Sequence, residues 1–390
     1  MTDPGAIHAG PASGADSPPR PVAQLQQRRL PLPLRLGLQG GGAHGAYTWG
    51  VLDALLEAGC FDIEAISGTS AGAMNAVVLA QGWTAAVQAG RSPEDGARAA
   101  LERFWHAVAK LAPVDWGGTH GDAAEPALSP ATRLVLQWSQ LLALSPYQLN
   151  PLARNPLREL LVEQVDFELL DAACPIQLHV AATQANTGRL RLFGNRLARQ
   201  HATDPASHGA LCADAAMASA CLPTLQPAVM IDGEPYWDGG YSANPALLPL
   251  VQGAGACDVL IVMLAPLAFG DTPTTAAEIR NRAVEFAFNA SFVREAQLLA
   301  ALKPPSGAAH GWLVKVARAL LPLSVPVGVP RWHLIDADLG HLPSETKLIA
   351  RRDFLDHLRE RGRERAQRWL AQDAARVGRI SSVDLGQLLR

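Results

Sequence analysis

Two stretches decide the fold: residues 34–45 read LRLGLQGGGAHG, and residues 63–72 read IEAISGTSAG. In each stretch a short apolar run precedes glycines and other small residues, and an apolar segment of helical length follows. Strand, turn and helix in repeated succession are typical of a parallel α/β sheet, because the helix returns the chain to the start of the next strand. We therefore expect strands at 34–38 and 63–66 and helices at 46–58 and 71–80.

The rest of the chain continues this alternation. An Asp232-Gly233 pair between two short apolar runs predicts a β-hairpin. The uncharged run at 259–264 is typical of a strand buried on both faces, and from about residue 271 onward the pattern is mainly helical. The expected strands are 176–183, 190–193, 229–231, 235–237, 259–264 and 332–336, and the expected helices include 95–110 and 213–220.

The composition is that of a folded globular chain. Of 390 residues, 48% are hydrophobic and 18% are charged, and 33 Lys and Arg against 36 Asp and Glu give a net charge of −3. These values exclude a disordered chain and give no support to a nucleic-acid-binding role. The five cysteines are scattered without a CxxC pair, which favours a reducing compartment and argues against a disulfide scaffold or a zinc site.

The mean hydropathy of +0.07 is high enough to require a search for membrane spans. The longest uncharged run, residues 65–90, has sufficient length but contains Ser, Thr, Asn and Gln throughout. Residues 1–31 lack the apolar core of a signal peptide and are rich in Ala, Pro, Gly and Gln, which predicts a disordered tail. We expect a cytoplasmic protein.

The first motif with chemistry is a G-x-S-x-G pattern centred on Ser70, between an expected strand and an expected helix. This is the context of a nucleophile elbow, in which glycines let the backbone turn tightly and expose the serine hydroxyl. The positive end of the following helix favours negative charge nearby. A turn of small residues without chemistry would have the same pattern. The motif residues are Gly68, Thr69, Ser70, Ala71 and Gly72.

The second motif is a glycine-rich loop, also between a strand and a helix. Its amides at a helix start can bind an anion, and its glycines match the G-x-G-x-x-G pattern of dinucleotide-binding folds, with Glu64 near the next strand. A dinucleotide site does not explain why that strand leads into the Ser70 elbow, whereas an oxyanion hole explains both motifs. The loop residues are Gly40, Gly41, Gly42, Ala43, His44 and Gly45.

A nucleophilic serine requires a base. Of the eleven histidines, His44 comes too early for the usual order of nucleophile, acid and histidine, and three later ones lie in no recognisable motif. Those three are His310, His333 and His341, and we expect them to be surface or structurally satisfied residues. Asp238 is a better candidate, because the glycines after it permit a sharp turn that leaves its carboxylate free to reach a hydroxyl. The turn continues with Gly239 and Gly240.

Together the three motifs resemble those of patatin-like phospholipases, in the same order and at similar spacing. Residues 218–223, ASACLP, also resemble the segment that precedes the Asp-Gly-Gly turn in that family. The resemblance covers about residues 34–265, and residues 351–370 are similar to part of the C-terminal extension of bacterial members. It implies an α/β fold with a three-layer α/β/α core and a mainly parallel central sheet.

The resemblance also implies a mechanism without a metal or cofactor. Ser70 would attack a carboxylic ester and form an acyl-enzyme, while Asp238 would accept the serine proton and later activate water. The amides around Gly41, Gly42 and Ala43 would hold the oxyanion. Because a carboxylate is a weaker base than imidazole, the dyad requires partial burial of Asp238 or a short hydrogen bond to the serine.

One position departs from the family pattern. Many members carry Lys or Arg where this chain has His44, and a permanent cation there would help to bind a phosphate group. The charge of His44 depends on pH, so a neutral ester is also an expected substrate. Alternatively, His44 simply packs at the start of the helix.

We expect three parts along the chain: the disordered tail at 1–31, a patatin-like catalytic domain at 32–270, and a mainly helical extension at 271–390. Within the catalytic domain, residues 113–156 are a candidate insertion. Its apolar stretch at 134–144 could form a lid, although ordinary packing on the core is favoured.

Two segments of the extension bear on membrane contact. Residues 311–321 mix apolar residues with Lys315 and Arg318, which fits a helix in a membrane interface and, more readily, a packed surface helix. Residues 351–370 contain seven Arg against four Asp or Glu at helical spacing, which first predicts a solvated helix face and secondarily anionic-lipid contact.

The leading hypothesis is a serine lipid acyl hydrolase, with a lipid or other ester as its partner and peripheral contact at the inner membrane face. One alternative is a general carboxylesterase on neutral or polyester substrates, and another is a catalytically silent lipid-binding module. A nucleotide-binding protein is a further alternative, but it gives Asp238 no role. The sequence carries no indication of the oligomeric state.

Overall fold

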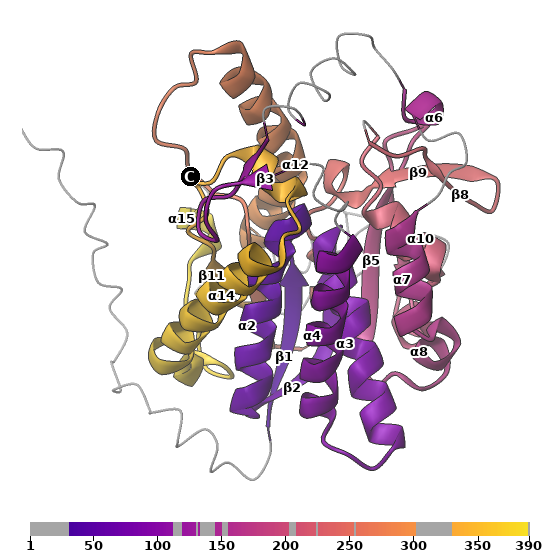
Figure 1. Cartoon of the computed structure of the whole chain (residues 1–390). Helices are drawn as coiled ribbons and strands as arrows, with labels where there is room; N and C mark the ends of the chain where they lie inside the picture. Colours follow the sequence, from indigo (N-terminus) through magenta and orange to yellow (C-terminus); the bar gives the residue numbers. More distant parts are fainter. Residues whose placement is uncertain are drawn as a thin grey trace, which may run out of the picture.

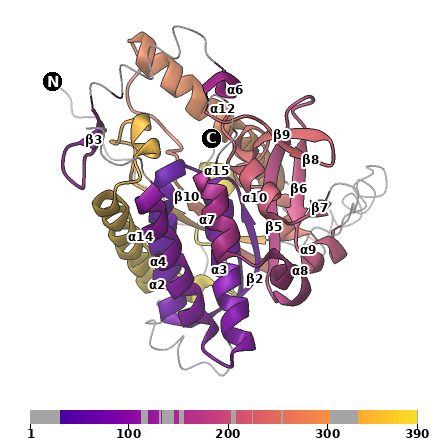
Figure 2. The ribbon, with the colours of Figure 1, turned by 45° about the vertical axis from the view of Figure 1, so that its right-hand side comes forward.

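A mixed sheet lies between two layers of helices (Figures 1 and 2). The computed structural model describes residues 31–111, 119–129, 132, 145–149, 155–202, 208–223, 225–252, 255–301 and 330–388. Within these residues the sheet has nine strands, and a separate two-stranded ribbon pairs β3 (Thr119–His120) with β4 (Ala127–Leu128).

The centre of the sheet is parallel. Its strands follow the order β11-β10-β1-β2-β5, and each pairs in parallel with its neighbour. These strands are β1 (Leu32–Leu38), β2 (Phe61–Gly68), β5 (Gln177–Gln184), β10 (Cys257–Met263) and β11 (Pro330–Asp336). The expected mainly parallel sheet is therefore confirmed.

Beyond β5 the sheet becomes mixed. The strand β6 (Leu190–Gly194) is antiparallel to β5, and β7 (His208–Ala210) is parallel to β6. A hairpin of β8 (Val229–Ile231) and β9 (Glu234–Asp238) also joins β5, through antiparallel pairing of β9. The hairpin that Asp232-Gly233 predicted is confirmed.

Alternate side chains of the central strands enter two different hydrophobic clusters. Leu36 and Leu260 belong to a cluster with helices of one face, whereas Val259 and Ile261 belong to a cluster with helices of the other. The first layer contains α2 (Gly45–Ala58), α3 (Ala71–Gln88), α4 (Pro93–Leu111) and α14 (Arg352–Gln372), and the second contains α11 (Leu248–Val251), α12 (Ala276–Ala301) and α15 (Leu385–Leu388). This arrangement is the three-layer α/β/α core that the family resemblance implied.

Several short elements were not expected from the sequence. The helices α7 (Pro156–Gln164), α8 (Phe167–Ala173) and α9 (Arg196–Gln200) are too short for a clear apolar periodicity. Each begins after a residue whose side chain accepts a backbone hydrogen bond from the first turn, namely Asn155, Asp166 and Asn195. The helix expected at 213–220 is present as α10 (Ala213–Ser219). The other short helices are α6 (Pro146–Leu149), η1 (Gly42–His44), η3 (Gly239–Tyr241), η5 (Ser344–Leu348) and η6 (Ala374–Arg376).

The C-terminal part packs onto the same sheet as the expected catalytic domain. It supplies the edge strand β11 and the helix α14, which lies along α2 (Figure 1). At the amino end of β10, Asp258 accepts hydrogen bonds from Arg331 and from the amide of Gly378. The domain boundary near residue 270 stays a prediction.

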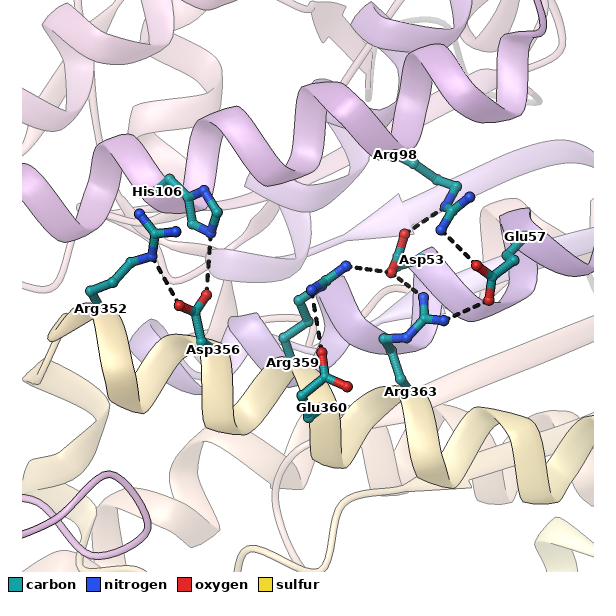
Figure 3. A network of polar contacts seen from close by, with 9 residues as sticks. All are labelled: Asp53, Glu57, Arg98, His106, Arg352, Asp356, Arg359, Glu360 and Arg363. Carbon is teal, nitrogen blue, oxygen red and sulfur yellow. Dashed lines mark hydrogen bonds and ion pairs between the residues drawn. The ribbon is translucent and has the colours of Figure 1, made fainter.

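The arginines of α14 are not simply a solvated face, contrary to the expectation for residues 351–370. Arg359 and Arg363 both form ion pairs with Asp53 of α2, whose side chain is only 3% exposed (Figure 3). Arg98 of α4 also binds Asp53, at 2.7 Å. The helix periodicity placed these arginines on one face, but only packing against α2 and α4 could supply their partners.

Some sequence expectations lie outside the described residues. They concern most of the tail at 1–31, the candidate lid at 134–144 and the candidate interfacial segment at 311–321. Among the helices that the structure describes, each is too short or too polar to cross a membrane. All five cysteines are free thiols.

Candidate active site

Ser70 lies at the sharp turn between β2 and α3. Its backbone has φ 53° and ψ −123°, a strained conformation for a residue with a side chain. Ser70 precedes the first residue of α3, so the amides of that helix start lie beside it. The strand, turn and helix predicted for a nucleophile elbow are all present, and Ser70 is half-buried at its tip.

The glycines of the elbow are required by close backbone contacts. A Cβ atom on Gly68 would lie 2.6 Å from the carbonyl oxygen of Gly72, and one on Gly72 would lie 2.2 Å from the carbonyl oxygen of Leu38. Neither distance is compatible with a side chain. Glycine is needed at both positions because the start of α3 packs directly against the end of β2 and the end of β1.

Sheet pairing brings Asp238 to the same place. Ala182 of β5 pairs with Arg191 of β6 on one side and with Asp238 of β9 on the other. Nearer the amino end of β5, this second side is occupied by β2, whose last residue Gly68 pairs with Val180. The strands β2 and β9 therefore lie on the same side of β5, with β9 nearer the carboxyl end of β5. Asp238, the last residue of β9, is consequently placed near Ser70, although the two are far apart in sequence.

Asp238 is fully buried and has no cationic partner among the described ion pairs. Burial raises the pKa of Asp238 to about 7, while a hydrogen bond from the Gly240 amide and the nearby Ser70 hydroxyl lower it by less. The Gly240 nitrogen lies 2.7 Å from Oδ1. The other oxygen, Oδ2, has no partner in full hydrogen-bond geometry, so it can accept a bond from the nearby Ser70 hydroxyl after a small movement.

The Asp-Gly-Gly turn also depends on missing side chains. A Cβ atom on Gly239 would lie 2.2 Å from the carbonyl oxygen of Ala181, and one on Gly240 would lie 2.3 Å from the ring of Phe288 on α12. The Asp238 amide donates to the carbonyl of Cys221 at 2.8 Å. These contacts fix the direction of the carboxylate.

The glycine loop lies directly against the elbow. A Cβ atom on Gly40 would be 2.7 Å from Cβ of Ser70. Gly42 has φ 58°, in the left-handed region that favours glycine, and starts the short helix η1. Gly41, Gly42 and Ala43 lie at the start of η1, and the first amides of a helix have no partner within it.

His44 packs against η5 and α14 at the start of α2. Its side chain is buried, its Nε2 lies 2.7 Å from the hydroxyl of Thr346, and its ring contacts Phe354 edge-on. Burial lowers the pKa of His44 to about 3, with smaller contributions from the charges of Lys347 and His341. A pKa this low leaves His44 neutral at physiological pH, and its contacts agree with the packing interpretation.

Other candidates from the sequence are engaged elsewhere. His333 is a buried residue of β11, and its two ring nitrogens lie 2.9 Å from Asp258 and 3.1 Å from Ser382. Glu64 forms an ion pair with Arg35 within the sheet at 2.9 Å, away from the glycine loop. Within the described residues no group of three His, Cys, Asp or Glu side chains is arranged to hold a metal ion.

A family model for patatin-like phospholipases matches residues 36–251, which include the glycine loop, the elbow and the Asp-Gly-Gly turn. The chain belongs to this family. Among curated proteins, no relative matches.

Two solved structures are similar to this patatin-like chain over most of its length. VipD from Legionella pneumophila has 16% identity and a TM-score of 0.38, with 86% of this chain and 66% of VipD covered. ExoU of Pseudomonas aeruginosa, in its complex with SpcU from the type III secretion system, has 19% identity and a TM-score of 0.31, with 87% and 51% covered. This chain thus spans about two thirds of VipD and half of ExoU.

Three buried polar residues of the patatin-like site were missed as separate candidates. Ser219 contacts the backbone of Ser70, Asn244 contacts the backbone of Gly40, and Gln39 binds Asn289 and Asn244. Ser219 lies inside the ASACLP segment that the resemblance singled out, but nothing in that segment indicated which atom it would bind. Asn244 and Gln39 are polar residues in otherwise apolar or small-residue stretches, which is a weak signal of buried hydrogen bonding.

Proposed function

We propose that this chain is a serine lipid acyl hydrolase in which Ser70 is the nucleophile and Asp238 is the general base. The observation that carries the proposal is the placement of Asp238, a buried carboxyl group with a pKa of about 7, directly beyond the strained Ser70 elbow. A base whose pKa lies near the working pH combines a useful deprotonated fraction with sufficient proton affinity.

The first half of the reaction makes an acyl-enzyme. Asp238 accepts the proton of the Ser70 hydroxyl as the serine oxygen bonds to the ester carbonyl carbon, and the same proton then passes to the leaving alcohol as the ester bond breaks. In the second half, Asp238 takes a proton from water while the hydroxide attacks the acyl carbon. Ser70 recovers its proton as the carboxylic acid leaves, so no cofactor is consumed.

The tetrahedral intermediates carry a negative oxygen. The amides of Gly41, Gly42 and Ala43 and the start of α3 are the groups that would stabilise it, because oriented amides in a partly buried site require little reorganisation. Gly40 lies against Ser70, so this loop is close enough to the nucleophile for that role.

The state of His44 favours a second candidate substrate, a neutral carboxylic ester. A His44 that is neutral and bonded to Thr346 brings no positive charge to the glycine loop. Phospholipids and neutral lipids are therefore both candidate substrates, because both contain the carboxylic ester bond that Ser70 would attack.

The test is an ester panel of phospholipids, lysophospholipids, acylglycerols and short-chain nitrophenyl esters, combined with covalent labelling by a fluorophosphonate probe. We expect hydrolysis of at least one lipid ester and labelling that disappears in Ser70→Ala. A folded wild-type protein that neither labels nor hydrolyses would support the catalytically silent lipid-binding module instead.

A further inference from the structure

Two backbone amides in the proposed site are each bound by a side-chain oxygen from a distant part of the chain. The amide of Ser70 donates to Oγ of Ser219 at 3.0 Å, across 149 residues. The amide of Gly40 donates to Oδ1 of Asn244 at 2.7 Å, across 204 residues. Ser219 is fully buried and Asn244 is 3% exposed, so water does not readily replace either acceptor.

Ser219 connects the proposed nucleophile with the proposed base. Two residues after Ser219, the carbonyl of Cys221 accepts a hydrogen bond from the amide of Asp238 at 2.8 Å. The short segment from Ser219 to Cys221 therefore bonds to the backbone of Ser70 at one end and of Asp238 at the other. Its length sets the separation of the two residues between which the proton must move.

Asn244 connects the glycine loop with the elbow and with β10. The residue before it, Ala243, accepts a hydrogen bond from the hydroxyl of Thr69 at 2.8 Å. Its own carbonyl accepts from Gln39, whose Oε1 in turn accepts from the amides of Leu264 and Ala265. The segment at Asn244 thus joins the ends of β1, β2 and β10.

We propose that Ser219 and Asn244 are positioning residues for acyl transfer. Ser219 holds the nucleophile in line with Asp238, and Asn244 holds the glycine loop at the distance from Ser70 that oxyanion binding requires. The inference rests on the proposed function, but it concerns residues that touch neither the ester nor the transferred proton.

The expected effect is on kcat and not on KM. Removing either acceptor leaves a partly buried amide without its partner, and we expect the loop that carries the amide to shift. Displacement of catalytic groups by about 1 Å can cost about a hundredfold in rate. We expect Ser219→Ala and Asn244→Ala each to lower kcat about tenfold to a hundredfold while KM changes less than about threefold.

Two matched controls separate positioning from general loss of stability. Ser381 accepts a hydrogen bond from the amide of Trp332 at 3.0 Å, and Asn195 accepts one from the amide of Leu178 at 3.1 Å. Both bonds are of the same type as those at the site but lie away from it. Ser381→Ala and Asn195→Ala should lower the melting temperature and leave kcat per folded molecule within about twofold of wild type.

The experiment compares kcat, KM, melting temperature and the rate of fluorophosphonate labelling for wild type, the two site variants and the two controls. A selective loss of kcat and of labelling rate in Ser219→Ala and Asn244→Ala supports the proposal. Unchanged kcat in these two variants, or an equal loss in the controls, overturns it. If Ser219→Ala does not fold, Ser219→Cys retains a weak acceptor and gives the same comparison. An inactive, unlabelled wild type would instead refute the proposed function.

Discussion

Asp238 and Asp258 are two buried aspartates at opposite ends of the sheet, with opposite electrostatic properties. Asp238 lies beyond the carboxyl end of β2. Burial raises its pKa to about 7, and its polar neighbours are the neutral Gly240 amide and the Ser70 hydroxyl. Asp258 lies at the amino end of β10. Burial also raises its pKa, but hydrogen bonds from His333, Arg331 and the Gly378 amide lower it to about 2.

The comparison shows how strongly the polar partners influence what a solvent-inaccessible carboxylate does. Both side chains are 1% exposed or less. A carboxylate held by Arg331 and His333 keeps its charge and anchors the C-terminal segment to the sheet, whereas one without a cation exchanges a proton near neutral pH. The four predictions that follow test this contrast.

The largest expected effect is on catalysis by Asp238→Asn. Because the amide cannot accept the serine proton, we expect the rate of ester hydrolysis to fall about a thousandfold, while the hydrogen bond to the Gly240 amide and the fold are kept. Steady-state kinetics and circular dichroism measure the two properties. Substantial activity in this variant would mean that another group is the base, and Ser70→Ala sets the baseline.

Asp258→Asn should instead affect stability. It removes the charge that Arg331 and the buried His333 share, so we expect the free energy of unfolding to fall by about 3 kcal/mol, with kcat per folded molecule unchanged. Urea unfolding measures this loss, and Asp62→Asn on the exposed side of β2 is the control. A loss of kcat without a loss of stability would contradict the division of roles between the two ends of the sheet.

The contributions of the two aspartates to folding stability should change in opposite directions as pH rises. Since the pKa of Asp238 in the folded state, about 7, exceeds the ordinary aspartate value of 3.8, this group makes the protein less stable as pH rises from about 4 to about 7. The pKa of Asp258 is lowered to about 2, so its stabilisation is present above pH about 4 and is lost as pH falls through about 2.

The buried His44 also has a lowered pKa, so its contribution to stability changes with pH in the opposite direction to that of Asp238 over part of this range. Each variant is therefore compared with wild type, which shares this contribution, in urea unfolding at several pH values. The stability of Asp238→Asn relative to wild type should rise between pH 4 and 7. In the active enzyme, kcat/KM should fall below pH about 7 as Asp238 is protonated. A flat kcat/KM profile from pH 5 to 8 would be inconsistent with Asp238 as the base.

The smallest expected effect concerns a third buried aspartate, Asp53, on the α2 face. Burial raises its pKa, but hydrogen bonding to Arg98 and the charges of Arg363 and Arg359 lower it overall. We expect Asp53→Asn to cost about 1–2 kcal/mol in unfolding free energy, because the arginines are partly exposed and two of them also bind Glu57 (Figure 3). Thermal unfolding measures the loss, and a change in kcat would show that α14 affects the site.

Local sequence signals predicted the elements that hold the site. The strand, elbow and helix around Ser70, the glycine loop and the Asp232-Gly233 hairpin follow from rules that act over a few residues, such as backbone sterics and apolar periodicity. Short elements such as α9 and β7 were missed because capping and sheet-edge pairing, rather than periodicity, determine them. The arginines of α14 were correctly predicted to lie on a helix, but two of them bind Asp53 of α2 instead of lying on a solvated face.

The sequence by itself determined which residues could form an elbow, an anion-binding loop and a turn that presents a carboxylate, because glycine spacing limits the backbone locally. Only the tertiary structure decided that β9 pairs with β5 on the same side as β2, that His44 is neutral and bonded to Thr346, and that Ser219 and Asn244 bind the amides of Ser70 and Gly40. The physical reason is that pairing across long separations and the pKa of a buried group depend on which other segments exclude water from it, and no local pattern specifies those segments.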